Sequence, residues 1–418
     1  MPSPIAPTAF SRIARLASLR PVHAAFQWLH LHESQIMRWQ VEMVAIPAPP
    51  FGEGPRSAWV LERFRELGLM DAHVDEIGNV LGYLPGPEGA KPGNEGSAAR
   101  PCILLSAHID TVFPAETPLN PRIEGARLEA PGACDNAAGV AGLLAIAAAL
   151  RHASVPLACD LLFAANVGEE GDGDLRGIRH LYQHSRYKTR IAANVVLDGA
   201  GHEVVVAQAL GSRRFLVSIT GRGGHSWSDA GTPNPIMVLA AAITRLSMVS
   251  LPAEPRTTVN VGTIEGGTSV NSIPERATAR FDFRSTDPEQ LIRMEVELHR
   301  AVEDAVLTAN RLEPARPLQF TIDTIGDRPA AGLPADAAIL ESLRAVDRHL
   351  KLRTELRVGS TDANIPLSMG IEAISMGAGG DGGSVHTRAE WYNSAHRDLG
   401  LRRVLLLVLA LLENASGQ

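Results

Sequence analysis

The chain is poor in cysteine and lacks a long apolar segment. Its three cysteines, Cys102, Cys134 and Cys159, are too few and too scattered for a disulfide framework or a CxxC metal site, which favours a reducing compartment. The longest apolar run, from Val404 to Leu412, is about half as long as a membrane-spanning helix. We therefore expect a cytoplasmic protein with no membrane partner, whose last apolar run forms a buried helix.

An excess of positive charge is also lacking. Lys and Arg number 39 against 46 Asp and Glu, which gives a net charge of -7, and no basic stripe runs along the sequence. Proteins that bind nucleic acids neutralise phosphates with Lys and Arg, so the composition disfavours a nucleic-acid partner. Hydrophobic residues make up 45% and charged residues 20%, as is usual for globular proteins.

The pattern along the chain predicts an α/β domain interrupted by a smaller domain. Apolar runs at 103–112, 160–167 and 193–200 each end in polar or acidic residues, as central strands of an α/β sheet do, and the Ala-rich segment 137–152 is typical of a helix packed on that sheet. From residue 212 the order changes to strand, helix, strand, strand, helix, strand, which is the order of a ferredoxin-like α+β unit.

The length supports this division, because 418 residues exceed the roughly 250–300 that one hydrophobic core usually serves. We expect an N-terminal extension over 1–32, a catalytic domain over 33–211 and 327–418, and an inserted lid over 212–326. The extension contains no acidic residue, and transit peptides are also poor in acidic residues. We nevertheless favour a plain extension with an exposed helix.

Candidate metal ligands lie where the predicted strands and loops end. His108 and Asp110 follow one strand, and a period of two directs both side chains to the same side, so that one can bind a metal while the other orients it. An ordinary polar strand end is the alternative for this pair. Asp135 lies in a glycine-flanked loop that opens the Ala-rich helix, where it is either a ligand or the N-cap of that helix.

Further acidic residues follow the next two predicted strands. Glu169 and Glu170 are adjacent, and neighbouring carboxylates at a buried sheet edge repel each other unless a cation or a shared proton relieves them. Asp198 ends the following strand, and His386 follows a glycine-rich loop. Two hard cations bridged by one carboxylate would satisfy the five candidate ligands together.

The order of these motifs resembles that of the M20 metallopeptidases, in the branch of peptidase T-like tripeptidases and dipeptidases. The resemblance runs from about Glu33 onward. It rests on five motifs, which are HxDTV at 108–112, Gly-x-x-Asp-x-x-x-Gly at 132–139, Glu-Glu at 169–170, Asp-Gly at 198–199 and the His-Thr loop at 386–387.

The resemblance implies a three-layer αβα zinc-exopeptidase-like domain that holds two divalent metal ions. His108, Asp135 and Asp198 would bind one ion, and Asp135, Glu170 and His386 would bind the other, so that Asp135 bridges them. Zinc is the expected metal, with cobalt and manganese as alternatives that suit the same ligands.

The resemblance also assigns the catalytic residues. Glu169 would be the general base for a hydroxide shared by the two ions, and Asp110 would orient His108. Many family members have a second Asp at the position of Asn136, and in the family the bond before it is cis, so we expect a cis bond between Asp135 and Asn136.

Three residues of the lid match family positions that reach the substrate. His225 resembles a histidine that often comes from the partner subunit of a dimer, so a homodimer through the lid is expected. Asn271 and Arg284 match positions that contact the substrate, and the resemblance implies contact with its terminal carboxylate. From the residues alone, a lone histidine such as His225 is more often a surface residue, and pairing with Asp282 or Asp287 explains Arg284 equally well.

The sequence thus predicts a di-metal hydrolase that cleaves short peptides. In the family, Asp at the position of Asp198 accompanies aminopeptidase, tripeptidase and dipeptidase activity. An amidohydrolase acting on N-acyl amino acids is the alternative on the same scaffold. A non-catalytic metal-binding protein is a third hypothesis, against which the presence of Glu169 and all five ligands argues.

Overall fold

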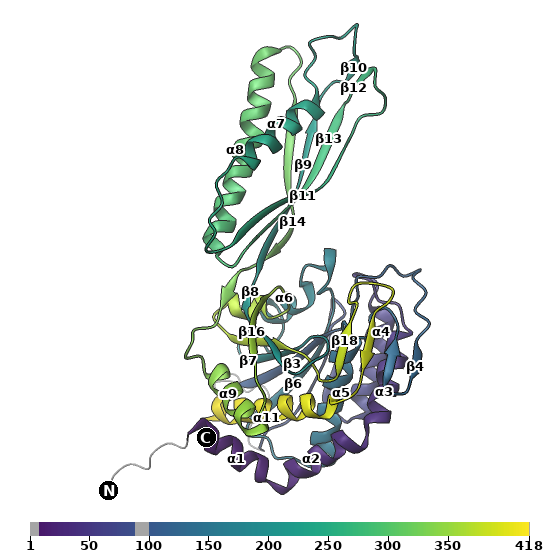
Figure 1. Ribbon diagram of the computed structural model, residues 1–418, viewed down its shortest axis with the longest axis vertical. Coiled ribbons are helices and arrows are strands. Elements are labelled where there is room, and N and C mark those ends of the chain that lie inside the picture. Colours follow the sequence, from purple (N-terminus) through teal and green to yellow (C-terminus); the bar gives the residue numbers. More distant parts are fainter. Residues whose placement is uncertain (1–7, 88–99, 418) are drawn as a thin grey trace, which may run out of the picture. The chain divides into compact units, whose positions relative to one another are not determined.

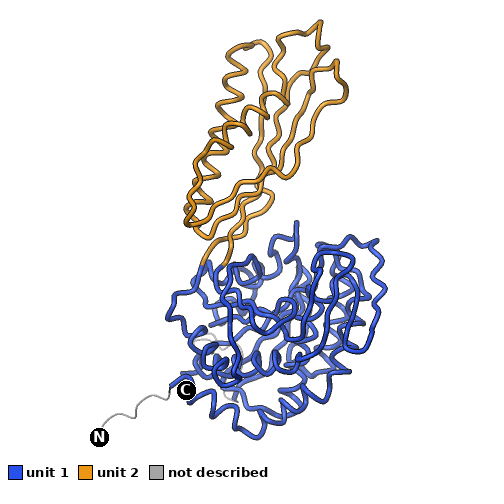
Figure 2. Tube along the Cα trace, viewed as in Figure 1, with its two compact units in different colours: residues 1–208, 332–418 blue, residues 209–331 orange. Residues whose placement is uncertain are grey.

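The computed structural model describes residues 8–87 and 100–417, which form two compact units (Figure 2). Unit 1 comprises residues 1–208 and 332–418, and unit 2 comprises residues 209–331. The sequence pattern predicts an insertion over 212–326, which is shorter than unit 2. The first strand of unit 2 begins at Gly211 and its last long strand ends at Arg328, so both ends lie outside the predicted bounds.

Unit 1 is built on a mixed sheet of nine strands (Figure 1). Its order is β1-β2-β6-β3-β7-β17-β8-β15, with β16 paired to β8. The central strands β6, β3, β7 and β17 are parallel to one another. On one side β2 pairs with β6, and β1 with β2, in antiparallel fashion, and on the other side β8 is antiparallel to β17. The strands are β1 (Met70–Val74), β2 (Val80–Leu84), β3 (Cys102–His108), β6 (Asp160–Asn166), β7 (Ile191–Leu197), β8 (Val204–Ala209), β15 (Ala331–Gly332), β16 (Glu355–Gly359) and β17 (Glu372–Met376).

Helices cover both faces of this sheet, which gives the three αβα layers that we predicted. Strand β3 shows why, because its side chains alternate between two apolar cores: Ile103 and Leu105 belong to one, and Cys102 and Leu104 to the other. The first face carries α4 (Gly54–Glu66), α5 (Ala137–His152), α9 (Ala338–Leu350) and α11 (Arg397–Ser416), and the second carries α6 (Arg176–Gln183) and α10 (Asn364–Ser368).

The terminal helix α11 buries the whole apolar run from Val404 to Leu412, as predicted. Within the described residues, no helix combines the length and the apolar character that crossing a membrane requires. A second, small sheet of unit 1 has the order β18-β19-β5-β4. Its strands are β4 (Arg122–Glu124), β5 (Arg127–Glu129), β18 (Asp381–Gly383) and β19 (Trp391–Asn393).

The segment that we expected to be an exposed extension is part of unit 1. Its described residues form helices α1 (Ala9–Ser18) and α2 (Arg20–Leu31), and α3 (Glu33–Val44) follows directly. Helix α1 packs against α9 and α11, and α2 packs against α5 and α11. The apolar residues of these helices recur at helical spacing on one face, so burial against the sheet's helical layer explains the difference.

Unit 2 has the predicted ferredoxin-like order. Its sheet runs β11-β13-β9-β14, all pairs are antiparallel, and α7 and α8 pack on one face over a core of its own. A two-stranded pair, β10 with β12, is an addition that the sequence did not predict. The elements are β9 (Gly211–Thr220), β10 (Gly224–His225), α7 (Pro235–Ser247), β11 (Thr257–Gly266), β12 (Ser272–Ile273), β13 (Arg276–Ser285), α8 (Pro288–Leu312) and β14 (Gln319–Arg328).

The packing of α2 can be tested by paired substitutions. Leu29 is fully buried, whereas Leu31, two residues further, is 73% exposed. We expect Leu29→Ala to lower the free energy of unfolding by about 2–5 kcal/mol, since it leaves a cavity, and Leu31→Ala to change it by less than about 0.5 kcal/mol. Denaturant unfolding measures both, and equal, small effects would show that α2 is not part of the folded core.

Candidate metal centre

The candidate ligands gather at one edge of the main sheet of unit 1. His108 is the last residue of β3, and Asp198 directly follows β7. Glu169 and Glu170 follow β6 after two further residues. Because β6, β3 and β7 are parallel, their carboxyl ends meet at the same edge, where open α/β sheets bind their ligands (Figure 1).

Asp135 lies at the centre of this group, with one imidazole at each carboxylate oxygen. Its Oδ1 is 3.1 Å from Nε2 of His108, and its Oδ2 is 2.9 Å from Nε2 of His386. The His386 Nε2 atom is also 3.1 Å from Oε1 of Glu170, and the His108 Nε2 atom is 3.8 Å from Oδ1 of Asp198. The structure therefore brings all five predicted ligands together in two sets that share Asp135.

These distances suit two metal ions. Two ligand atoms bound to one zinc ion at about 2.1 Å in tetrahedral geometry lie about 3.4 Å apart, close to the separations in both sets. Oδ1 of Asp135 is buried and faces Nε2 of His108, so an ion bound between these two atoms would have both of them as ligands. His108, Asp135 and Glu170 also satisfy the geometric condition for a shared ion.

The electrostatics of the cluster favour positive charge. Burial alone would lower the pKa of His108, but hydrogen bonds with the surrounding carboxylates raise it well above its usual value. Hydrogen bonds with Asp135 and Glu170 raise the pKa of His386 to about 10. Burial would raise the pKa of Asp135, yet the two histidines hold it well below its usual value. Protons thus occupy the imidazoles when no cation is bound, and metal binding has to displace them.

Asp110 connects the ligands to the predicted base. Its carboxylate is fully buried and accepts the backbone N–H groups of Glu169, at 3.0 Å, and Glu170, at 2.8 Å. The Nδ1 atom of His108 is 3.6 Å from Oδ1 of Asp110 and 3.2 Å from its backbone oxygen. Asp110 therefore fixes the Glu169–Glu170 segment and also lies beside His108. Burial would raise the pKa of Asp110, but His108 and these amides hold it below the usual value.

The N-cap of α5 is Asn136, so the Asp135 side chain does not cap this helix. The Asn136 side-chain oxygen accepts the N–H groups of Gly139, at 3.0 Å, and Gly199, at 2.9 Å, and its amide donates to the Leu197 oxygen at 2.9 Å. The bond between Asp135 and Asn136 is cis, as the resemblance implied. Asn136 thus ties the bridging loop to the end of β7, and this supports the ligand interpretation of Asp135 over the N-cap alternative.

Glu390 is a residue of the site that the sequence analysis missed. It is fully buried, and its carboxylate accepts the backbone N–H groups of Gly132, Cys134 and Asp135 at 2.7–2.9 Å. Burial raises the pKa of the Glu390 carboxyl. The partner segments are some 250 residues apart in sequence, and local patterns do not predict such a pairing.

Two further buried charges lie behind the site and were also missed. Asp362 is fully buried and accepts a hydrogen bond from Asn166 at 2.7 Å, and burial raises the pKa of its carboxyl to about 7. Arg56 donates to the backbone oxygens of Ile46 and Ile109, each at 2.7 Å. Burial lowers the pKa of Arg56 to about 10, against the opposing effect of Asp110. Neither residue belongs to a sequence motif, so no local pattern predicts its role.

The three predicted lid residues belong to unit 2 and do not form one group there. His225 in β10 is exposed and accepts the N–H of Trp227 at 3.2 Å, and the backbone oxygen of Asn271 accepts the Ser226 N–H at 3.0 Å. Arg284 lies near the other end of β13 and donates to Asp282 at 2.7 Å. The pairing that we named as the alternative for Arg284 is therefore present.

A hydrolase with a two-ion candidate centre is the class of protein that this fold and this ligand set define. Residues 104–410 match the family model described as peptidase family M20/M25/M40, and the chain belongs to this family.

Similar proteins span the chain to different extents. A probable carboxypeptidase of Arthroderma gypseum is 26% identical over 250 residues, which are 52% of this chain and 52% of that protein, so the match spans about half of that relative. A tripeptidase structure from Staphylococcus aureus has a TM-score of 0.71 at 21% identity, over 92% of this chain and 99% of that one. The aminopeptidase PepT structure from Bacillus cereus has a TM-score of 0.70 at 19% identity, over 91% and 98%. These structures share the fold.

Proposed function

We propose that the protein is a di-metal peptidase of the peptidase T-like branch that removes residues from short peptides with a free amino terminus. The observation that carries this proposal is the position of Asp135 between His108 and His386, with a different carboxylate oxygen facing each imidazole. One protein carboxylate shared by two ligand sets is the arrangement that a pair of catalytic ions requires. The tripeptidase and PepT structures with the same fold support the choice of substrate class.

Five side chains would hold the two ions, and Glu169 and Asp110 would serve the proton transfer. His108, Asp135 and Asp198 would hold one ion, and Asp135, Glu170 and His386 the other, with zinc as the expected metal. Two such ions, when bound, lower the pKa of a water molecule and polarise the scissile carbonyl. Glu169 accepts the proton of the water and passes it to the leaving amine, and Asp110 holds the Glu169 backbone in place through its N–H.

A pocket beside the ligands favours a positively charged group of the substrate. It has a volume of about 320 Å³, and in the described chain it is lined by small or apolar residues and three carboxylates, without Lys or Arg. Two of the carboxylates, Asp135 and Asp198, are candidate metal ligands, which leaves Asp381 for the substrate. An α-ammonium group suits such a pocket, whereas the acyl group of an N-acyl amino acid gains nothing from Asp381.

Substitution of Glu169 separates catalysis from metal binding. We expect Glu169→Ala to lower kcat for di- and tripeptides by about 10²–10⁴-fold, because the proton acceptor is lost, while metal content by mass spectrometry stays at the wild-type level. Glu170→Ala should lower the metal content itself. Asp172→Asn, an exposed change in the same loop, is the control and should alter neither quantity. A Glu169→Ala variant that retains wild-type turnover would remove the basis of the proposed mechanism.

Substitution of Asp381 distinguishes the peptidase hypothesis from the N-acyl amino acid hydrolase hypothesis. We expect Asp381→Asn to raise KM for free tripeptides about 10-fold, which corresponds to one charge-assisted hydrogen bond, and to leave kcat nearly unchanged. Glu129→Gln, on strand β5 of the same small sheet, is the exposed control. If wild-type protein prefers N-acetylated amino acids and Asp381→Asn has no effect, the amidohydrolase alternative is correct.

We also propose that a second subunit completes the substrate site. His225 and Asn271 lie near the end of unit 2 where Arg276 pairs with Thr220, and Arg284 lies eight residues along β13, about 26 Å away. A tripeptide spans only about 10 Å, so a single lid cannot bring both ends to one substrate. We expect mixtures of His225→Ala and Glu169→Ala, each inactive alone, to recover activity. A fully active monomer in sedimentation would contradict this.

The three cysteines are buried and free, which supports a cytoplasmic location as our prediction for the protein.

A further inference from the structure

A second group of metal-ligating side chains lies in unit 1, away from the candidate centre. It begins at the turn between β1 and β2, where Asp75 and Glu76 are adjacent. The Asp75 carboxylate fixes the turn, because its Oδ1 accepts the N–H groups of Ile77, Gly78 and Asn79 at 2.9–3.1 Å. Its Oδ2 accepts one hydrogen bond, from the Asn79 side chain, and therefore keeps a lone pair for another partner.

Helix α6 presents two histidines one turn apart. The buried face of α6 comprises Gly177, Ile178, Leu181 and Tyr182, so His180 lies off that face. His184 is the C-terminal cap of the helix and is exposed, and the two imidazole rings are 5.1 Å apart between centroids. Histidines spaced i, i+4 on a helix can bind one metal ion together.

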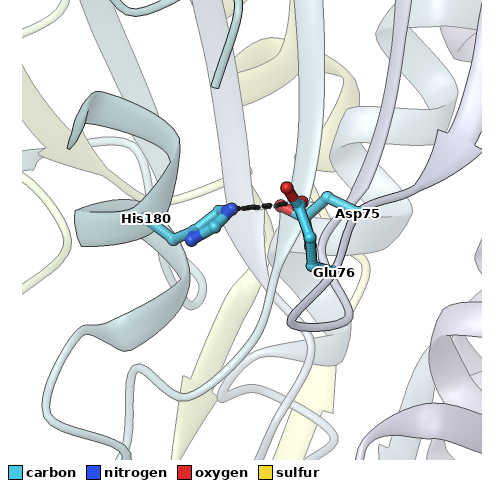
Figure 3. A group of neighbouring side chains, drawn as sticks. All are labelled: Asp75, Glu76 and His180. Carbon is cyan, nitrogen blue, oxygen red and sulfur yellow. Dashed lines mark hydrogen bonds and ion pairs between the residues drawn. The ribbon is translucent and has the colours of Figure 1, made fainter. Parts of the chain in front are cut away.

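The turn and the helix face each other through these side chains (Figure 3). The Nε2 atom of His180 is 3.3 Å from Oε2 of Glu76 and 3.9 Å from Oδ2 of Asp75. Ligand atoms of His180, Glu76 and Asp75 all lie within 4.8 Å of one another. Side-chain exposure rises from 6% for Asp75 through 16% for His180 to 77% for Glu76, so the group is anchored on the inside and open to entry from solvent.

The charge of the group favours a cation. Two carboxylates meet a single imidazole at the contact, and both arginines of α6 have other partners. Arg176 donates to the Ile77 oxygen and to Glu53, and Arg179 is 3.7 Å from Asp174. An ion pair between His180 and Glu76 alone would not use the remaining lone pair of Asp75. A divalent transition metal uses all three, and a set of imidazoles with carboxylates is typical of zinc, cobalt and nickel.

We propose that Asp75, Glu76, His180 and His184 form a further, structural binding site for a divalent transition-metal ion such as Zn2+. The site joins the β1–β2 turn to α6. Asn79, in the same turn, donates to the Gly177 oxygen at 3.0 Å and accepts the Val167 N–H at 3.0 Å. Val167 precedes Glu169 by two residues, so an ion here stabilises the turn that supports the loop of the proposed base.

The test compares metal content between variants of the full-length protein. Protein stripped with a chelator is reloaded with Zn2+, desalted and analysed by mass spectrometry. We expect His180→Gln, which keeps a hydrogen-bond donor toward Glu76, to hold one Zn2+ fewer per chain than wild type. Glu76→Gln, an exposed change that does not threaten folding, should weaken the same ion, and Zn2+ should raise the melting temperature of either variant less than that of wild type.

The control is His73→Gln. His73 lies on β1 and is 3.7 Å from Asp71 in a histidine–carboxylate pair without a second carboxylate or an i, i+4 histidine, so its substitution should leave the metal content unchanged. Equal content in wild type, His180→Gln and Glu76→Gln would overturn the proposal, as would an equal loss in His73→Gln. The readout is a difference between variants that share the candidate di-metal centre, so it holds whatever that centre contains.

Discussion

The organisation of unit 1 depends on the repulsion between carboxylates at the carboxyl edge of its main sheet. Asp135, Glu170 and Asp198 converge there with only two imidazoles between them, and the raised pKa values of His108 and His386 show how strongly this edge favours positive charge. Like charges in a poorly hydrated environment are costly unless cations balance them. Protons on the histidines or metal ions in their place would balance these charges, and the proposed hydrolysis needs the metal ions.

The position of the proposed base follows from the same constraint. Asp110 contacts the back of His108 and also accepts the N–H groups of Glu169 and Glu170. A single buried carboxylate therefore lies against one candidate ligand and holds the backbone of another and of the proposed base. Because these groups share one anchor, a change at Asp110 would move all three together, whereas Asp198, at the end of β7, depends on a different strand.

Much of this was predictable from sequence, and what was not predictable involves distant partners. The apolar runs gave β3, β6 and β7, and the ferredoxin-like order of unit 2, because both depend on local periodicity. The candidate site residues were predicted from motifs at strand ends. Glu390 and Asp362 did not, because their roles come from contacts with segments remote in sequence. The lack of acidic residues over 1–32 favours an extension, and only tertiary packing reveals the buried stripe of α1 and α2.

One hydrogen-bonding arrangement recurs in three loops of unit 1 that hold candidate functional residues. Asp110, Glu390 and Asp75 are each buried carboxylates that accept two or three backbone N–H groups of a loop. Loop amides have no ladder partner, and a buried N–H without an acceptor is costly. A carboxylate satisfies several of them at once and fixes the loop's path. Most of the candidate ligands and the proposed base can therefore lie on loops, where a substrate would reach them, and still be held in place.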